Sequence, residues 1–190
     1  MNLILASTSP RRQEILKQLG FTFVVEKSDF VELDKIKCLP QEFVSKNSYG
    51  KAMAVAKKYD DETVILAADT VVAFAGEILG KPQDDEQAVS MLKLLSGNTH
   101  KVFTGLCLIK GKDVFSAVEE TLVTFRELSF SEITSYVKTK EPLDKAGSYG
   151  IQIKGAAFVE KVNGCYYNVV GLPVVCFLKL LKKAGIDFEY

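Results

Sequence analysis

Val64–Pro82, VILAADTVVAFAGEILGKP, is the stretch that decides the fold of this 190-residue chain. The apolar run Val64–Ala68 has the length and composition of a strand that is buried on both faces. Asp69 interrupts it, and a carboxylate inside a buried strand is costly unless it is paired or binds a cation. After a turn at Gly76-Glu77, Lys81 follows on a constrained loop where it could meet an anion. The stretch therefore predicts a ligand site; the alternative is a buried Asp bonded to backbone amides and a surface Lys.

A second unit of strand, turn and helix stands at the N-terminus. The strand Leu3–Ala6 runs into a helix whose start and end are marked by Ser9, Pro10 and Gly20. Arg11 and Arg12 fall in the first turn, where the helix dipole disfavours cations. A bound anion removes this conflict, because free amides, hydroxyl groups and two guanidinium groups together form a phosphate site. The alternative is two solvated arginines whose stems cover the core.

Between these units the sequence predicts a helix over 40–59, preceded by a mixed acidic segment. Gly50 in the middle of this helix costs about 1 kcal/mol against alanine. It indicates close packing or a local irregularity just before Lys51, which alone would be taken for a surface residue. The acidic segment carries three carboxylates that either help to hold a metal or are solvated: Asp29, Glu32 and Asp34.

Helices and strands alternate through the rest of the chain. Capping boxes, Asp84 with Gln87 and Ser129 with Glu132, begin two helices. Residues 102–110 and 114–126 predict two long antiparallel strands, Asn163-Gly164 a type I′ hairpin between strands 156–162 and 165–167, and 174–183 a final helix. The loop 143–152 combines two close glycines with charged and amide side chains, which is typical of a ligand-binding loop.

Together these elements predict an α/β fold with a long mixed β-sheet, flanking helices and two lobes, in a single bilobed domain over residues 1–190. Lysines and arginines balance the acidic residues at 24 each, which disfavours a nucleic-acid-binding module. Four widely spaced cysteines indicate free thiols in a reducing cytoplasm and disfavour a zinc site. Neither a signal peptide nor a membrane span is evident. His100, the single histidine, is a weak candidate for a catalytic base.

Several motifs, in order along nearly the whole chain, together resemble the Maf family of nucleoside triphosphate pyrophosphatases. Each motif alone is weak, whereas the ordered set is highly specific. The motifs are Ser7-Thr8-Ser9-Pro10-Arg11-Arg12, Lys51-Ala52, Ala68-Asp69-Thr70-Val71-Val72, Gly80-Lys81-Pro82, Leu95-Ser96-Gly97 with His100 and Thr104-Gly105, Glu141-Pro142, Lys145-Ala146-Gly147-Ser148-Tyr149-Gly150-Ile151-Gln152, and Asn168-Val169-Val170-Gly171-Leu172-Pro173.

This resemblance implies hydrolysis of a nucleoside triphosphate to monophosphate and pyrophosphate, with a divalent cation, Mg²⁺ or Mn²⁺, in a cleft between two lobes of a Maf/ITPase-like fold. It implies that Asp69 is the general base and, with Glu32, holds the metal. The phosphate-binding residues of the family fall on Ser7, Arg11, Arg12, Lys51 and Lys81. Three positions that select dTTP and UTP in the family fall on Arg12, Thr70 and Gln152, so pyrimidine nucleotides are the expected substrates.

The chain departs from the family pattern at two places, Asn47-Ser48-Tyr49-Gly50 before the helix lysine and the segment 28–37. Two other functions stay open: a nucleotide-binding regulator of cell division without catalysis, and a pyrophosphatase that prefers another, modified or methylated nucleotide. We expect a small-molecule nucleotide as the partner, with no nucleic acid and no membrane. A homodimer is an open alternative to a monomer.

Overall fold

The computed structural model of the protein describes residues 2–33 and 38–188. Within them seven strands form one sheet in the order β2-β1-β3-β5-β6-β7, with β4 paired to β3. β1 pairs in parallel with β2 and β3, whereas β4 and β7 pair antiparallel with β3 and β6. The predicted mixed α/β sheet is thereby confirmed. The strands are β1 (Leu3–Leu5), β2 (Phe23–Val25), β3 (Val64–Phe74), β4 (Glu77–Leu79), β5 (Thr99–Lys110), β6 (Asp113–Phe125) and β7 (Val159–Asn163).

The helices begin where local signals place them. Ser9 stands at the N-cap of the first helix without a side-chain bond. The Asp84 carboxylate accepts from the Gln87 N–H, and Ser129 with Glu132 forms a complete capping box, as predicted. The α-helices are α1 (Pro10–Gln18), α2 (Pro40–Ala56), α3 (Asp85–Leu95), α4 (Phe130–Lys138), α5 (Tyr166–Val170) and α6 (Val174–Lys183), and the 3₁₀ turns are η1 (Glu141–Asp144), η2 (Ala146–Ser148) and η3 (Lys154–Phe158). In the described part of the chain no helix is long and apolar enough to cross a membrane.

The chain divides into two compact units. The first consists of Met1–Asp69, Thr104–Glu119 and Gly171–Tyr190, and the second of Thr70–Phe103 and Glu120–Val170. The boundaries fall inside β3, β5 and β6, so each of these long strands contributes to both units.

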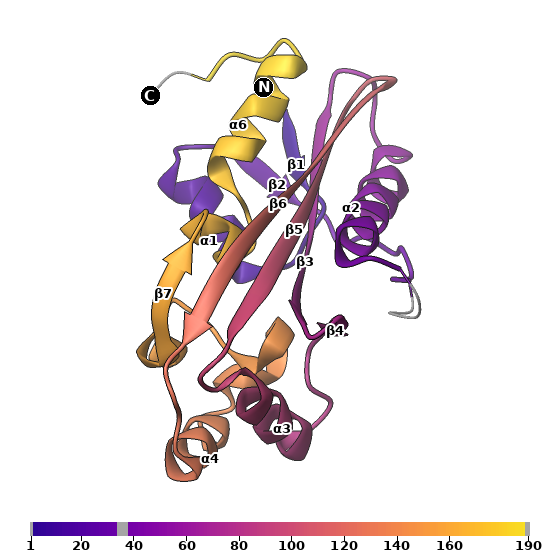
Figure 1. The fold of residues 1–190 in the computed structure, drawn as a ribbon. Helices are drawn as coiled ribbons and strands as arrows, with labels where there is room; N and C mark the ends of the chain where they lie inside the picture. The colour runs from indigo at the N-terminus through magenta and orange to yellow at the C-terminus, as the bar shows by residue number, and fades with distance from the viewer. Residues whose placement is uncertain (1, 34–37, 189–190) are drawn as a thin grey trace. The chain divides into compact units, whose positions relative to one another are not determined.

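The first unit packs α2 against β1, β3 and β5. Ile65 and Ala67 of β3 lie in one core cluster with Ala52 and Val55 of α2. Because side chains alternate along a strand, Leu66 points to the opposite face, where it is also buried. Figure 1 shows α2 on one side of these strands and α6 on the other. The alternation determines which β3 side chains meet α2.

Gly105 of β5 lets the backbone of α2 approach the sheet closely. A Cβ atom at this position would overlap the carbonyl group of Val44 in α2. The helix therefore rests on the strand through main-chain atoms, and this contact sets the height of α2 above the sheet.

The second unit contains α3, α4 and the loop that follows α4. α3 and α4 lie side by side (Figure 1). Gly147, with φ 67, lies in the loop against Val72, and a Cβ atom there would come within 2.8 Å of the Val72 side chain. Its N–H donates to the carbonyl of Gly80 at 3.1 Å. The loop 143–152 is thereby tied to the loop that carries Lys81.

The hairpin predicted at Asn163-Gly164 is wrong. β7 ends at Asn163, but the chain then enters the short helix α5 instead of a second strand. The Cys165 N–H donates to the Thr121 hydroxyl of β6 at 3.0 Å, and the Asn168 amide donates to the Val102 carbonyl of β5 at 3.0 Å. These tertiary bonds override the local turn preference of Asn-Gly.

Candidate functional site

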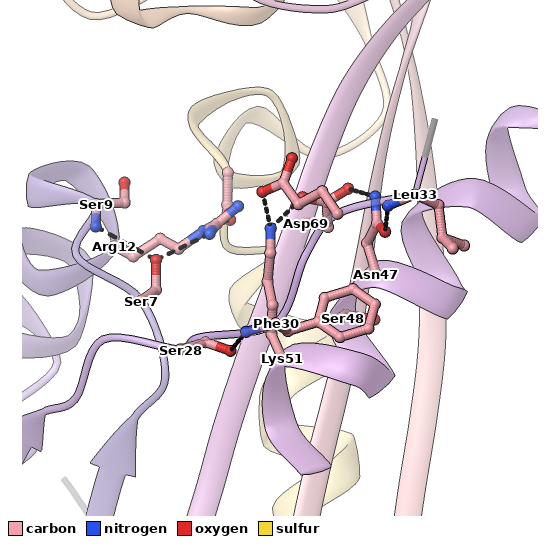
Figure 2. Close-up of polar contacts among 12 residues, drawn as sticks. Ser7, Ser9, Arg12, Ser28, Phe30, Leu33, Asn47, Ser48, Lys51 and Asp69 are labelled. Atoms are coloured by element: carbon pink, nitrogen blue, oxygen red, sulfur yellow. Dashed lines mark hydrogen bonds and ion pairs between the residues drawn. The ribbon is translucent and has the colours of Figure 1, made fainter. Parts of the chain in front are cut away.

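Asp69 reaches α2 because of its place in β3. It follows Ile65 and Ala67 at two-residue intervals, so its side chain points to the α2 face of the strand. The residue is 7% exposed. One carboxylate oxygen, Oδ1, accepts from the Lys51 Nζ at 2.6 Å, and Oδ2 accepts from the Asn47 Nδ2 at 3.1 Å (Figure 2). Within the described residues, two side chains of one helix rather than backbone amides therefore satisfy this buried carboxylate.

Lys51 lies between two carboxylates. Its ammonium contacts Glu32 Oε1 at 2.7 Å as well as Asp69 Oδ1 at 2.6 Å, and its side chain is only 14% exposed. The interpretation of Lys51 as an ordinary surface residue is therefore wrong. Two acidic groups from segments far apart in the sequence converge on one cation.

Gly50 explains how the acidic segment reaches the helix. A Cβ atom on Gly50 would overlap the ring of Phe30, so the glycine accommodates this ring against α2. The close packing predicted from Gly50 is confirmed. Phe30 lies two residues before Glu32, and its contact with α2 places Glu32 beside Lys51.

Arg12 is buried, so the solvated alternative is wrong for this residue. Its Nε donates to the Gly171 carbonyl at 2.8 Å, and its Nη1 donates to the Ser7 hydroxyl at 3.0 Å. Burial lowers the pKa of the guanidinium to about 10, against the opposing influence of the Asp69 carboxylate. Arg12 therefore stays protonated at neutral pH. Arg11, in the same helical turn, is half-buried.

The carboxylates of Asp69 and Glu32 suit a divalent cation whose other ligands come from a bound phosphate compound. Among residues 2–33 and 38–188 no group of three or more His, Cys, Asp or Glu could hold a metal ion. Asp69 and Glu32 nevertheless gather around one ammonium group. Mg²⁺ is commonly bound through one or two carboxylates together with phosphate oxygens, and this pair fits that pattern. Asp29 is exposed, and Asp34 lies outside the described residues.

The remaining predicted residues lie in the second unit. Thr70 follows Asp69 in β3 and is half-buried, whereas Lys81 and Gln152 are exposed on their loops. The bond between Gly147 and Gly80 joins these two loops. One unit thus brings together Ser7, Arg12, Glu32, Lys51 and Asp69, and the other brings together the loops of Lys81 and Gln152.

Asn47 and the Gly171 carbonyl receive no role in the sequence analysis, although both contact predicted site residues. The signal for Asn47 is its spacing, since residues four apart on a helix share a face and Asn47 precedes Lys51 by four. For the Gly171 carbonyl the sequence offers no signal, because a backbone acceptor depends on tertiary structure.

His100 is a structural residue. Its Nε2 lies 2.8 Å from the Tyr149 hydroxyl, and the Phe125 and Tyr149 rings pack against it edge to face. Burial lowers the pKa of the imidazole from 6.5 to about 4, so the ring is neutral at neutral pH. This buried, neutral position agrees with the prediction that His100 is a weak candidate for a catalytic base.

Stability should depend on pH through His100. The His100 imidazole has a pKa of 6.5 in the unfolded chain and of about 4 in the folded protein. Between these values it is protonated only in the unfolded chain, so the free energy of unfolding falls as the pH decreases from 6.5 toward 4. We expect the free energy of unfolding to drop by about 2 kcal/mol between pH 7 and pH 5. Urea denaturation of wild type and His100→Gln across this range measures the effect. In the variant the free energy of unfolding should depend less on pH. The same pH dependence in both proteins would contradict the role of His100.

Comparisons with known proteins identify the family of this chain. The family model described as "Maf-like protein" matches residues 2–184. A protein named dTTP/UTP pyrophosphatase from Bacillus cereus (strain G9842) is 45% identical over 188 residues, which cover 99% of this chain and 98% of that protein. Proteins of the same name from Acetivibrio thermocellus and Lachnoclostridium phytofermentans are 47% and 44% identical, over 98% and 97% of this chain and 97% and 96% of theirs.

Proposed function

Because the chain belongs to the Maf family, we propose that it is a nucleoside triphosphate pyrophosphatase that hydrolyses dTTP and UTP to the monophosphate and pyrophosphate. The observation that carries this proposal is the buried Asp69, which two side chains of α2 orient beside the cationic Arg12. A protein that only bound nucleotides would need the cations but would have no use for this oriented carboxylate.

Asp69 is the proposed general base. It would orient a water molecule and accept its proton as the water oxygen forms a bond to the α-phosphorus. The bond from the α-phosphorus to the oxygen of the β-phosphate breaks, and pyrophosphate leaves. Asp69 and Glu32 would hold Mg²⁺ or Mn²⁺, which supplies positive charge to the phosphates and lowers the pKa of water. No serine, cysteine or histidine nucleophile is needed.

The cationic side chains would bind the triphosphate, which carries about four negative charges near neutral pH. Arg12 in the first unit is held in place by the Gly171 carbonyl and the Ser7 hydroxyl, which limits the entropy that it loses on binding. Lys51 would turn its ammonium from the two carboxylates toward the phosphates. Arg and Lys stabilise charge that develops on the phosphate oxygens in the transition state. Ser7, Arg11 and Lys81 complete the proposed phosphate-binding set.

Gln152 is proposed to recognise the base together with Thr70 and Arg12. Its amide offers an acceptor and two donors, which match the carbonyl–NH–carbonyl edge of uracil and thymine. We expect Gln152→Ala to lower kcat/KM for UTP and dTTP by about 10-fold, and to affect ATP and CTP less, because unpaired polar groups penalise the preferred bases most.

The kinetics of all four nucleotides in wild type and variant measure this preference. Gln41→Ala, an exposed glutamine at the start of α2, is the matched control and should change none of them. An equal fractional loss on every nucleotide would mean that Gln152 supports its loop and does not recognise the base.

A panel of nucleoside triphosphates with pyrophosphate detection tests the proposed function. We expect the fastest release from dTTP and UTP, and none from any nucleotide without a divalent cation. Tight binding without pyrophosphate release would favour a regulator, and faster turnover of a purine or methylated nucleotide would reassign the substrate.

We place the activity in the reducing cytoplasm, a proposal that the four free cysteines support.

A further inference from the structure

Asn47 connects two parts of the site with one side chain. The residue is fully buried in α2. Its Nδ2 donates to Asp69 Oδ2 at 3.1 Å, and its Oδ1 accepts from the Leu33 N–H at 3.1 Å. A backbone N–H can only donate and a carboxylate oxygen accepts, so these two partners determine which end of the amide faces each of them.

Leu33 follows Glu32, so the second bond of Asn47 acts on the segment that carries the other carboxylate. This segment contacts α2 at three points, Phe30 against Gly50, Glu32 against Lys51, and Leu33 against Asn47. Positions 47, 50 and 51 share one face of a helix. The acidic segment and this face of α2 are therefore in contact with each other.

Asn47 and Lys51 both bind Asp69, but we expect only the bond of Asn47 to remain when a nucleotide binds. The Lys51 ammonium stands on a flexible stem, so it would turn toward phosphate when a nucleotide binds, and Asp69 and Glu32 would then be available to hold a divalent cation. The Asn47 amide is neutral and fully buried, so it would keep its bonds to both sides during that exchange.

We propose that Asn47 is a positioning residue, which couples the orientation of Asp69 to the segment that carries Glu32 and so fixes the two carboxylates for a divalent cation. This inference rests on the proposed pyrophosphatase function. Hydrogen-bond partners of metal ligands typically contribute 10- to 100-fold to metal affinity or activity, which sets the expected size of the effect.

Three variants test this role. Asn47→Leu keeps the branching and the number of side-chain heavy atoms and removes both bonds. Asn47→Asp keeps an acceptor for the Leu33 N–H but turns an oxygen toward Asp69. Ser48→Ala is the matched control, because Ser48 is equally buried in the same helix but its hydroxyl donates to the Ser45 carbonyl.

The measurements are kcat and KM for UTP, the dissociation constant of Mn²⁺ alone, and thermal unfolding. We expect Asn47→Leu to lower kcat and to weaken Mn²⁺ binding by about 10-fold or more, with KM within about twofold of wild type. Ser48→Ala should leave kcat and Mn²⁺ binding within about twofold. Asn47→Asp should lower kcat at least as much as Asn47→Leu. In that variant the Leu33 N–H should keep its acceptor and stay protected from hydrogen exchange.

Unchanged kcat and Mn²⁺ affinity in Asn47→Leu, or losses equal to those of Ser48→Ala, would overturn the inference. If Asn47→Leu does not fold, Asn47→Asp decides, and an unchanged kcat in that variant would overturn it as well. Failure of the wild type to release pyrophosphate would instead reject the proposed function, and the Mn²⁺ titrations would still test Asn47.

Discussion

Asp69→Asn should lower kcat for dTTP and UTP by at least about 100-fold, because the general base and its negative charge disappear together. The volume of the side chain is kept, so the fold should survive. The new NH₂ group would face either the Lys51 ammonium or the Asn47 amide, and both of these donate hydrogen bonds. We therefore expect some loss of stability besides the loss of turnover.

Pyrophosphate release on dTTP and UTP measures this effect, with thermal unfolding as the check on folding. Asp85→Asn is the matched control, because Asp85 is a half-exposed partner of Lys140 in the second unit. It should turn over both nucleotides like wild type. Near-normal activity of Asp69→Asn would reject Asp69 as the base.

Arg12→Ala should weaken the interaction with the triphosphate by roughly 1.5–3 kcal/mol, the range for hydrogen bonds to charged groups. This corresponds to about 10- to 150-fold in kcat/KM. The variant should also unfold more easily. Removal of a cation from a helix N-terminus is favourable by itself, but here the Gly171 carbonyl loses its donor and a buried side chain is deleted.

Kinetics with UTP and urea denaturation measure the two effects separately. Lys17→Ala, an exposed cation in the last turn of α1, is the control and should leave kcat/KM unchanged. Unaltered kcat/KM in a folded Arg12→Ala protein would leave Arg12 with a structural role only.

The sequence predicted those elements whose signals are local. The apolar run before Asp69 predicted β3, and the pairs Asp84–Gln87 and Ser129–Glu132 predicted the starts of α3 and α4. Local signals failed where tertiary contacts dominate, as at Asn163-Gly164, where bonds from Cys165 and Asn168 to β5 and β6 replace a hairpin with a helix.

The sequence predicted which charged residues form the candidate site, but not which of them contact one another. A lysine in a helix is usually solvated, whereas Lys51 is covered because α2 packs against β3 and against the segment that carries Glu32. The bonds that orient Asp69 join residues 22 and 18 positions apart. Such contacts depend on how helix and sheet meet, which the spacing of residues along the chain does not specify.

The contact of Gly105 with the backbone of α2 bears on how the protein can change over generations. Because peptide groups hold the helix at its height, aliphatic residues such as Val55, Ile65 and Ile109 can exchange for others of similar volume at a cost of under about 1.5 kcal/mol. Lys51 and Asn47 would keep their places during such drift. The evolutionary constraint concentrates instead on Gly105, where a single methyl group would push α2, with both of these side chains, away from Asp69.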